Sequence, residues 1–142
     1  MRVYVASSWR NDRQPGVVAA LRHAGHEVYD FRNPAPGDEG FHWSEIDRLW
    51  ELWGPEEFVA GLPHPIAQQG LAKNLAAMEW AEAFVLVNPG GRSSHLEAGW
   101  AIGAGKPLLI LLDKGEPELM YGLASHLHTS IWEVVKRLEE YR

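Results

Sequence analysis

The segment AFVLVNPGGRSSHLEAGWA, residues 83–101, decides the fold class. Its first five residues, 83–87, form an apolar run typical of a strand that is buried on both faces of a sheet. A loop rich in glycine and serine follows over 88–94, and residues 95–104 have helical period before Gly105-Lys106-Pro107 ends the helix. A buried strand, a glycine-rich turn and a helix in this order predict one β-α unit of a parallel sheet.

The same alternation runs along the rest of the chain. Apolar runs predict strands at 3–6, 26–31 and 108–112, with a short strand near Leu127, and helical spacing predicts helices from Pro15 to Gly25 and at 44–53, 65–80 and 131–141. We therefore expect an α/β protein. Residues 1–142 would form a single doubly wound domain, flavodoxin-like or Rossmann-like, with a four- to five-stranded parallel sheet flanked by helices.

Composition excludes several classes of protein. The chain has no cysteine, which excludes disulfides, thiolate metal sites and a cysteine nucleophile, and its seven histidines lack the spacing of a metal site. Thirteen basic against nineteen acidic residues give a formal net charge of −6 without a basic stripe, which argues against nucleic acid as a partner. Because neither a signal peptide nor an apolar run of membrane-spanning length is evident, we expect a cytoplasmic protein that does not bind membranes.

Two loops follow the carboxyl ends of predicted strands, where open α/β sheets bind their ligands. The first, residues 7–14, carries Ser7, Ser8 and Asn11 beside two arginines, Arg10 and Arg13. Either guanidinium can hold a phosphate in a fork of hydrogen bonds. The alternative is an ordinary polar surface loop.

The second loop places Gly90, Gly91, Ser93 and Ser94 ahead of Glu97. Free backbone N–H groups at the start of a helix favour an anion there and are expected to keep Glu97 ionised, as a nucleophile at a sugar carbon requires. The alternative is structural, because Ser94-x-x-Glu97 also matches a capping box, in which the glutamate only returns a hydrogen bond to the helix cap. Spacing alone leaves both hypotheses open.

Several of these segments together resemble the nucleoside 2-deoxyribosyltransferase family, including its nucleotide N-glycosidase branch. The segments are YVASSWR at 4–10, WAEAFVLV at 80–87, the glycine-rich loop leading into LEAGWA at 96–101, and GKP at 105–107 followed by an apolar strand. The resemblance implies that Glu97 is the nucleophile and that Tyr4 positions it. It also implies that Arg10 contacts a 5′-phosphate.

The sequence departs from the family pattern at two positions. Asn74 stands where the family usually has an aspartate that handles the leaving base, and an amide cannot donate a proton as a carboxylic acid does. Gly91 stands where an aspartate or serine often precedes the nucleophile, with Ser93 and Ser94 as nearby substitutes. The family also completes each site with a loop from a neighbouring subunit, which here corresponds to the region of Met120, so a homodimer or higher homo-oligomer is expected.

These observations predict cleavage or transfer at the N-glycosidic bond of a nucleoside, a deoxynucleoside or the 5′-monophosphate of either. The reaction would pass through a covalent glycosyl ester of Glu97 and use no metal or organic cofactor. Tyr4 and Asn74 are the other predicted catalytic residues. The predicted substrate-binding residues are Ser7, Ser8, Arg10, Gly90, Gly91, Ser93, Ser94 and Met120. Two alternatives stay open: a catalytically silent nucleotide-binding module of the same fold, and a glycohydrolase for other N-ribosides such as NAD.

Overall fold

A computed structural model describes all 142 residues of the chain, which divide into two compact units. The first unit comprises Met1–Asp30 and Trp80–Arg142, and the second comprises Phe31–Glu79. That the two units make one domain over 1–142 stays a prediction. No helix in the chain has both the length and the apolar character that crossing a bilayer requires.

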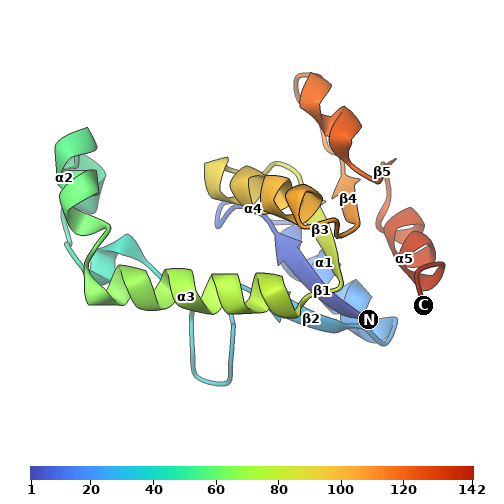
Figure 1. Cartoon of the computed structure of the whole chain (residues 1–142), viewed down its shortest axis with the longest axis horizontal. Helices are drawn as coiled ribbons and strands as arrows, with labels where there is room; N and C mark the ends of the chain where they lie inside the picture. The colour runs from blue at the N-terminus through green and yellow to red at the C-terminus, as the bar shows by residue number, and fades with distance from the viewer. The chain divides into compact units, whose positions relative to one another are not determined.

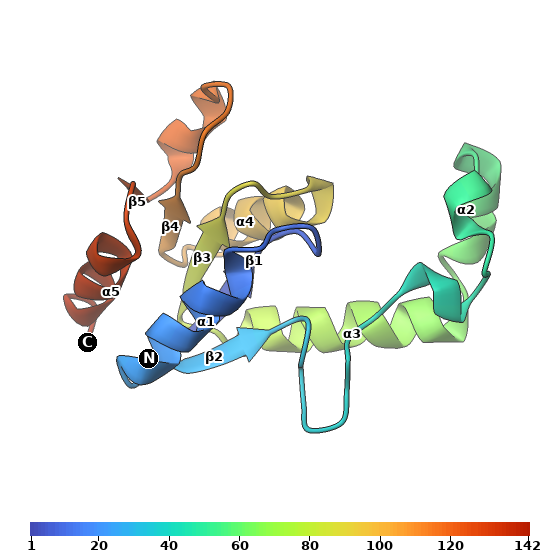
Figure 2. The ribbon, with the colours of Figure 1, turned by 180° about the vertical axis from the view of Figure 1, so that it is seen from behind.

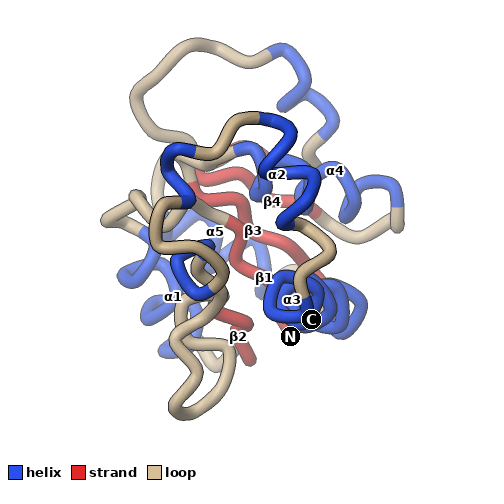
Figure 3. Tube along the Cα trace, turned by 90° about the vertical axis from the view of Figure 1, so that its left-hand side faces the viewer, coloured by secondary structure: helices blue, strands red, loops and turns tan.

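The first unit is built on a five-stranded sheet in which every neighbouring pair is parallel. The strands are β1 (Arg2–Ala6), β2 (Glu27–Asp30), β3 (Ala83–Val87), β4 (Leu108–Leu111) and β5 (His126–His128). Their order is β2-β1-β3-β4-β5, and Figure 3 shows the first four in this succession. The α/β class and the parallel sheet predicted from sequence are confirmed, with five strands.

Alternate residues of the strands face the two sides of the sheet. On one side, valine and leucine side chains of β1, β3 and β4 pack in a single core with helices α1 (Gln14–His23) and α5 (Ile131–Glu139). On the other side, Tyr4 and Phe84 are neighbours in register and stack with ring centroids 5.1 Å apart. Trp100 of α4 (Arg92–Gly103) lies 6.0 Å from the ring of Phe84. In Figure 1 α4 lies in front of the strands, and in Figure 2 α1 does, so the sheet is covered on both faces.

The strands are apolar because they are central. All residues of β3 and β4 are buried, and neither strand has a solvent face that would tolerate a polar side chain. Gly25, which follows α1 with φ of +84°, ends that helix in the left-handed region that favours glycine. This turn returns the chain to the amino end of β2.

The second unit contains the long helix α3 (Pro65–Trp80, whose last residue belongs to the first unit), the short helix α2 (Pro55–Gly61) and two 3₁₀ turns, η1 (Trp43–Glu45) and η2 (Trp50–Leu52). Its aromatic side chains gather around Trp43, which makes edge contacts with Phe41, Trp53 and Phe58 at centroid distances of 4.8 to 5.7 Å. These aromatic residues therefore form a partly exposed cluster within this unit.

The predicted helix over 44–53 is wrong. The Asp47 carboxylate accepts hydrogen bonds from the backbone N–H of Leu49 and from the indole N–H of Trp53, both at 2.8 Å. Such side-chain bonds to nearby groups compete with the helical pattern and divide the segment into two turns. Gly54-Pro55 was expected to end a helix, but it begins α2. Proline is tolerated at the first position of a helix because its missing N–H would have no partner within the helix there.

Candidate active site

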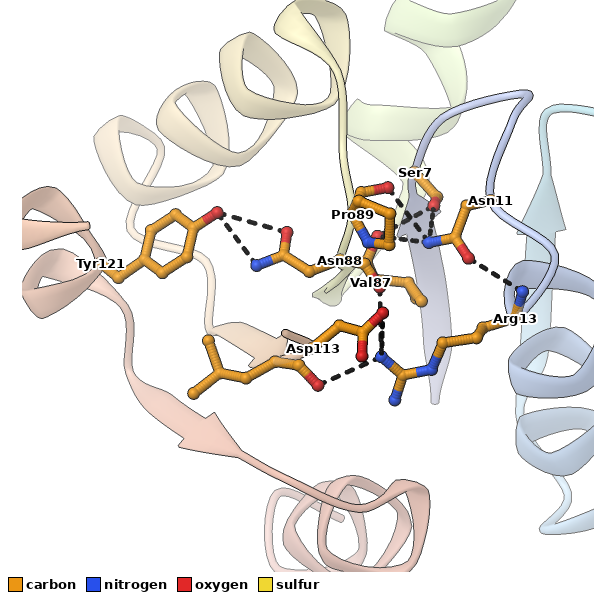
Figure 4. A network of polar contacts seen from close by, with 9 residues as sticks. Ser7, Asn11, Arg13, Val87, Asn88, Pro89, Asp113 and Tyr121 are labelled. Atoms are coloured by element: carbon orange, nitrogen blue, oxygen red, sulfur yellow. Dashed lines mark hydrogen bonds and ion pairs between the residues drawn. The ribbon is translucent and has the colours of Figure 1, made fainter. Parts of the chain in front are cut away.

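The strand order changes direction between β1 and β3, and the loops that follow these two strands meet at the same edge of the sheet. Figure 4 shows the polar contacts that join them. Asn11 is buried, and its side-chain amide donates to the backbone carbonyls of Val87 at 3.0 Å and Pro89 at 3.1 Å. The crevice where such sheets bind ligands is thus framed by residues of both predicted loops.

Asn11 is a framing residue that the sequence-based selection of site residues did not include. Its Oδ1 accepts from the backbone N–H of Arg13 at 2.8 Å, an Asx turn that leads into α1. An asparagine three residues before the start of a helix is the sequence signal of such a turn. Ser7 belongs to the same frame, because its hydroxyl donates to the Val87 carbonyl at 2.9 Å and accepts from Asn11.

The two arginines of the first loop have different surroundings. Arg13 Nη1 donates to the backbone carbonyls of Asn88 at 3.2 Å and Leu112 at 3.1 Å, and lies 3.8 Å from the Asp113 carboxylate (Figure 4). Arg13 therefore holds the ends of β3 and β4. The guanidinium of Arg10 is exposed and makes no hydrogen bond or ion pair within the chain, so it is the arginine that can meet a ligand.

The glycine-rich loop ends at Gly91, the cap of α4, which begins at Arg92, one turn earlier than predicted. Ser94 is consequently inside the helix and buried, where its hydroxyl donates to the Gly91 carbonyl at 2.7 Å. The capping box between Ser94 and Glu97 is wrong, because Ser94 is not the cap. Glu97 therefore does not return a hydrogen bond to the helix cap, which was the structural alternative to a catalytic role.

Position 90 requires a glycine because the side chains of Ser94 and Leu86 lie close to its backbone. A Cβ at this position would lie 2.6 Å from Ser94 Oγ, which is closer than real Cβ contacts allow, and 3.1 Å from Leu86 Cδ1, which is a tight contact. Gly91, by contrast, has open space on its Cβ side.

Glu97 lies in the second turn of α4 and faces Tyr4 in the middle of β1. The hydroxyl of Tyr4 is buried and has no hydrogen bond of ordinary geometry, yet it is close enough to stabilise the Glu97 carboxylate. Burial, with the charge of Glu97 as the next cause, raises the pKa of Tyr4 far above its usual value, so Tyr4 is a neutral phenol whose hydroxyl can act as a donor towards an ionised carboxylate. A carboxyl group and a phenol hydroxyl thus share a buried place between helix and sheet.

The ionisation of Glu97 differs from the sequence-based expectation. Burial raises the pKa of its carboxyl to about 7, and the Tyr4 hydroxyl opposes this rise. The helix dipole was expected to keep Glu97 ionised, but Glu97 is the sixth residue of α4, and the influence of the dipole falls off within the first turn. Glu97 therefore exchanges its proton near neutral pH.

The remaining predicted site residues lie in three places. Ser8 is in the first loop, where its hydroxyl accepts from the backbone N–H of Arg10 at 3.2 Å, and Ser93 is exposed in the first turn of α4. Met120 is exposed in the 3₁₀ segment η3 (Leu119–Leu123), which follows β4. Asn74 lies on α3 in the second unit, so its place next to Glu97 stays a prediction.

No group of three histidine, aspartate or glutamate side chains is arranged to hold a metal ion. The polar groups at the carboxyl edge are instead hydroxyls, backbone N–H groups, one exposed guanidinium and one buried carboxyl. Such a set suits an organic substrate with hydroxyl groups and an anionic substituent.

Comparison with solved structures identifies the fold. Over 95% of this chain and 90% of the other, it is similar to the 2-deoxyribosyltransferase of the psychrotolerant bacterium Bacillus psychrosaccharolyticus, with a TM-score of 0.65 and 19% identity. It is also similar to the CMP N-glycosidase BcmB of Clostridium botulinum, over 100% of both chains, with a TM-score of 0.57 and 19% identity. No protein-family model and no curated protein matches the sequence. The predicted resemblance is thereby confirmed at the level of the fold.

Proposed function

We propose that this protein cleaves or transfers at the N-glycosidic bond of a nucleoside, a deoxynucleoside or a 5′-monophosphate of either. The observation that carries the proposal is the partly buried carboxyl of Glu97 on α4, beside the Tyr4 hydroxyl of β1, one of the two strands between which the strand order changes. Burying an ionisable group without a structural partner is costly, and such groups are concentrated at functional sites. The shared fold with two N-glycosidic bond enzymes supports the same conclusion.

The chemistry follows from a carboxylate that is shielded from water. Ionised Glu97 attacks the anomeric carbon as the C–N bond breaks, and the bonding electron pair leaves with the base. The transition state resembles an oxocarbenium ion, which the negative carboxylate stabilises. Water or a second base then attacks the glycosyl ester, which releases the Glu97 carboxylate and gives overall retention of configuration.

The other groups bind and orient the substrate. The Tyr4 hydroxyl lies close enough to Glu97 to favour its ionised form, so part of the Glu97 population is a carboxylate near neutral pH. Arg10 offers an exposed guanidinium to a 5′-phosphate, and the exposed Ser93 hydroxyl can bond to the phosphate or the sugar, with Ser8 in the loop that carries Arg10. Asn74 meets the base or the sugar through hydrogen bonds, but its amide cannot protonate the leaving base.

A nucleotide-binding module without turnover is the second candidate. The observation that favours it is the amide of Asn74 at the position where an acid would assist the leaving base. Under this hypothesis the protein binds a nucleotide at equilibrium and releases no base during long incubation.

The test is chromatographic detection of free base from a panel of deoxynucleosides, ribonucleosides and their 5′-monophosphates. We expect the parent chain to release base and Glu97→Gln to be slower by at least about a thousandfold, because the amide cannot form the glycosyl ester. Glu27→Gln, which alters an exposed carboxylate at the start of β2, is the matched control and should match the parent. Equal rates in parent and Glu97→Gln would refute the assignment of Glu97.

A further inference from the structure

Three side chains form a hydrogen-bonded series beside the candidate active site, and the reaction proposed above uses none of them. His95 Nδ1 lies 2.7 Å from the Gly91 carbonyl, and His95 Nε2 lies 2.7 Å from the hydroxyl of Tyr121. The same hydroxyl lies 3.0 Å from Asn88 Nδ2 and 3.2 Å from Asn88 Oδ1. The rings of His95 and Tyr121 also stack, with centroids 5.7 Å apart and an angle of 13° between planes.

The order of donors follows from the chemistry of the groups. A carbonyl oxygen only accepts, so His95 Nδ1 carries a proton and donates it to Gly91. In the neutral imidazole Nε2 then accepts from the Tyr121 hydroxyl, and that oxygen accepts from the amide of Asn88. If His95 is protonated, Nε2 donates instead and the Tyr121 hydroxyl turns to Asn88 Oδ1. Both ring nitrogens of His95 and the Tyr121 hydroxyl keep a hydrogen-bond partner in both states.

The series joins two segments that are distant in sequence. Asn88 and Gly91 belong to the loop after β3, whereas Tyr121 belongs to η3, beyond β4 (Figure 4 shows the Asn88 and Tyr121 side chains facing each other). The other members of η3 are exposed, with 89% of Leu119 and 60% of Met120 accessible to solvent. Tyr121 is the one residue of η3 that is partly buried, so burial of apolar surface contributes little to holding this segment in place.

We propose that His95 and Tyr121 are positioning residues, which fix η3 against the glycine-rich loop and so set the geometry of the substrate-binding surface that these segments form. The inference rests on the proposed function for its substrate, since the two segments carry Gly90, Gly91 and Met120. Neither side chain takes part in bond breaking. Their removal weakens substrate binding and leaves the chemical step unchanged.

The test compares Tyr121→Phe with Tyr141→Phe in the full chain. Both substitutions remove one hydroxyl that is bonded to a histidine Nε2, because Tyr141 bonds to His126 at 2.9 Å near β5 and α5. The first readout is hydrogen–deuterium exchange of residues 88–93 and 119–123 without ligand. We expect Tyr121→Phe to accelerate exchange in both segments by about fivefold, the effect of losing one net hydrogen bond, and Tyr141→Phe to leave them unchanged.

The second readout separates positioning from a merely structural role. For the substrate that the parent uses best, Tyr121→Phe should raise KM by about fivefold and change kcat by less than about twofold. His95→Asn keeps a donor near the Gly91 carbonyl but no longer reaches Tyr121, so it should reproduce the effect of Tyr121→Phe. A fall in kcat at constant KM would overturn the proposal, and so would exchange rates equal to those of the Tyr141→Phe control.

Failure of the proposed function is distinguishable from failure of this inference. If the parent chain releases no base, the proposed function falls. The exchange experiment needs no substrate, and its result still decides whether His95 and Tyr121 hold η3 against the loop.

Discussion

Among the single residues, Glu97 is subject to two opposing effects on its ionisation. Burial between α4 and β1 favours its protonated form, while the Tyr4 hydroxyl favours the carboxylate. Burial prevails, which places the pKa near the pH at which cells work. As the proposed nucleophile, Glu97 is therefore partly protonated at neutral pH. Its ionised fraction is a poorly solvated and therefore reactive carboxylate.

The raised pKa of Glu97 predicts a pH-dependent stability. Because the folded pKa of about 7 exceeds the unfolded value of 4.5, the folded chain binds more protons between these values, and stability falls as pH rises through this window. Glu97→Gln removes the buried charge, so at about pH 8 it should raise the free energy of unfolding by on the order of 2 kcal/mol. Urea denaturation at several pH values measures this.

The gain from Glu97→Gln should vanish as the pH falls below about 4.5, where Glu97 becomes protonated in the unfolded state as well as in the folded state. Glu27→Gln, at an exposed carboxylate, should show no comparable change with pH. A Glu97→Gln variant that is less stable than the parent at high pH would show that the carboxylate is stabilised by its surroundings.

Site residues were predicted with uneven success. Glu97 and Tyr4 lie close together and Arg10 is exposed, whereas the roles that the resemblance implies for them stay predictions. The sequence did not reveal that Asn11 and Arg13 hold main-chain carbonyls, because such bonds depend on which strand ends meet in space. It also gave the wrong ionisation for Glu97, since burial is a property of the packed structure and has no local sequence signal.

At the level of elements, the start of α4 determines what Glu97 can do. Beginning at Arg92, the helix turns Ser94 inward to bond the Gly91 carbonyl and places Glu97 beyond the reach of the cap. This path is possible because Gly90 has no side chain. The glycine-rich loop is therefore needed for close packing within the chain as well as for any contact with a ligand.

Gly90→Ala should destabilise the protein. Its methyl group would overlap Ser94 Oγ and press on Leu86, and the backbone shift needed to relieve this costs about 1 to 3 kcal/mol. Gly99→Ala is the control within the same helix, since its Cβ meets nothing within 4 Å, and it should stabilise α4 by up to about 1 kcal/mol. Thermal unfolding of both variants measures the difference, and equal melting temperatures would show that the loop relaxes freely.

The elements of the sheet unit were predicted well, and so was the helix α3, whereas the segment of the second unit before α3 was not. Strands such as β3 and β4 are continuous apolar runs, which leave one interpretation. Residues 44–53 have the apolar spacing of a helix, but the Asp47 side chain bonds locally and prevents it. Hydrophobic periodicity indicates which face of a helix would be apolar. It gives no sign of a side chain, such as that of Asp47, whose local hydrogen bonds compete with those of the helix.

At the level of the whole molecule, apolar side chains are unevenly exposed. Within the second unit only Ala67, Ala77 and Met78 are buried apolar residues, whereas seven large apolar side chains are exposed. These seven are Leu49, Leu52, Phe58, Val59, Leu62, Leu71 and Leu75. Large exposed apolar patches on a protein mark interaction surfaces.

We therefore expect the protein to form a homodimer or higher homo-oligomer. Size exclusion with light scattering should give at least twice the mass of the chain, and replacing Leu49 and Leu52 together by lysine should shift the mass towards that of the monomer. Replacing Leu127, which is 48% exposed on β5 in the first unit, by lysine is the matched control. A monomeric mass for the parent over a wide range of concentration would contradict the expectation.

The hydrogen bonds of Asn11 and Arg13 affect which positions of this protein can be substituted without altering the edge of the sheet. Both side chains bond to main-chain carbonyls, of Val87, Pro89, Asn88 and Leu112, and these atoms are the same whichever amino acid stands there. Substitution of the residues that carry these carbonyls leaves these hydrogen bonds intact, and Arg10, which precedes Asn11 in the chain, takes no part in them. Ligand preference can therefore drift, in nature or under laboratory selection, while the edge of the sheet keeps its shape.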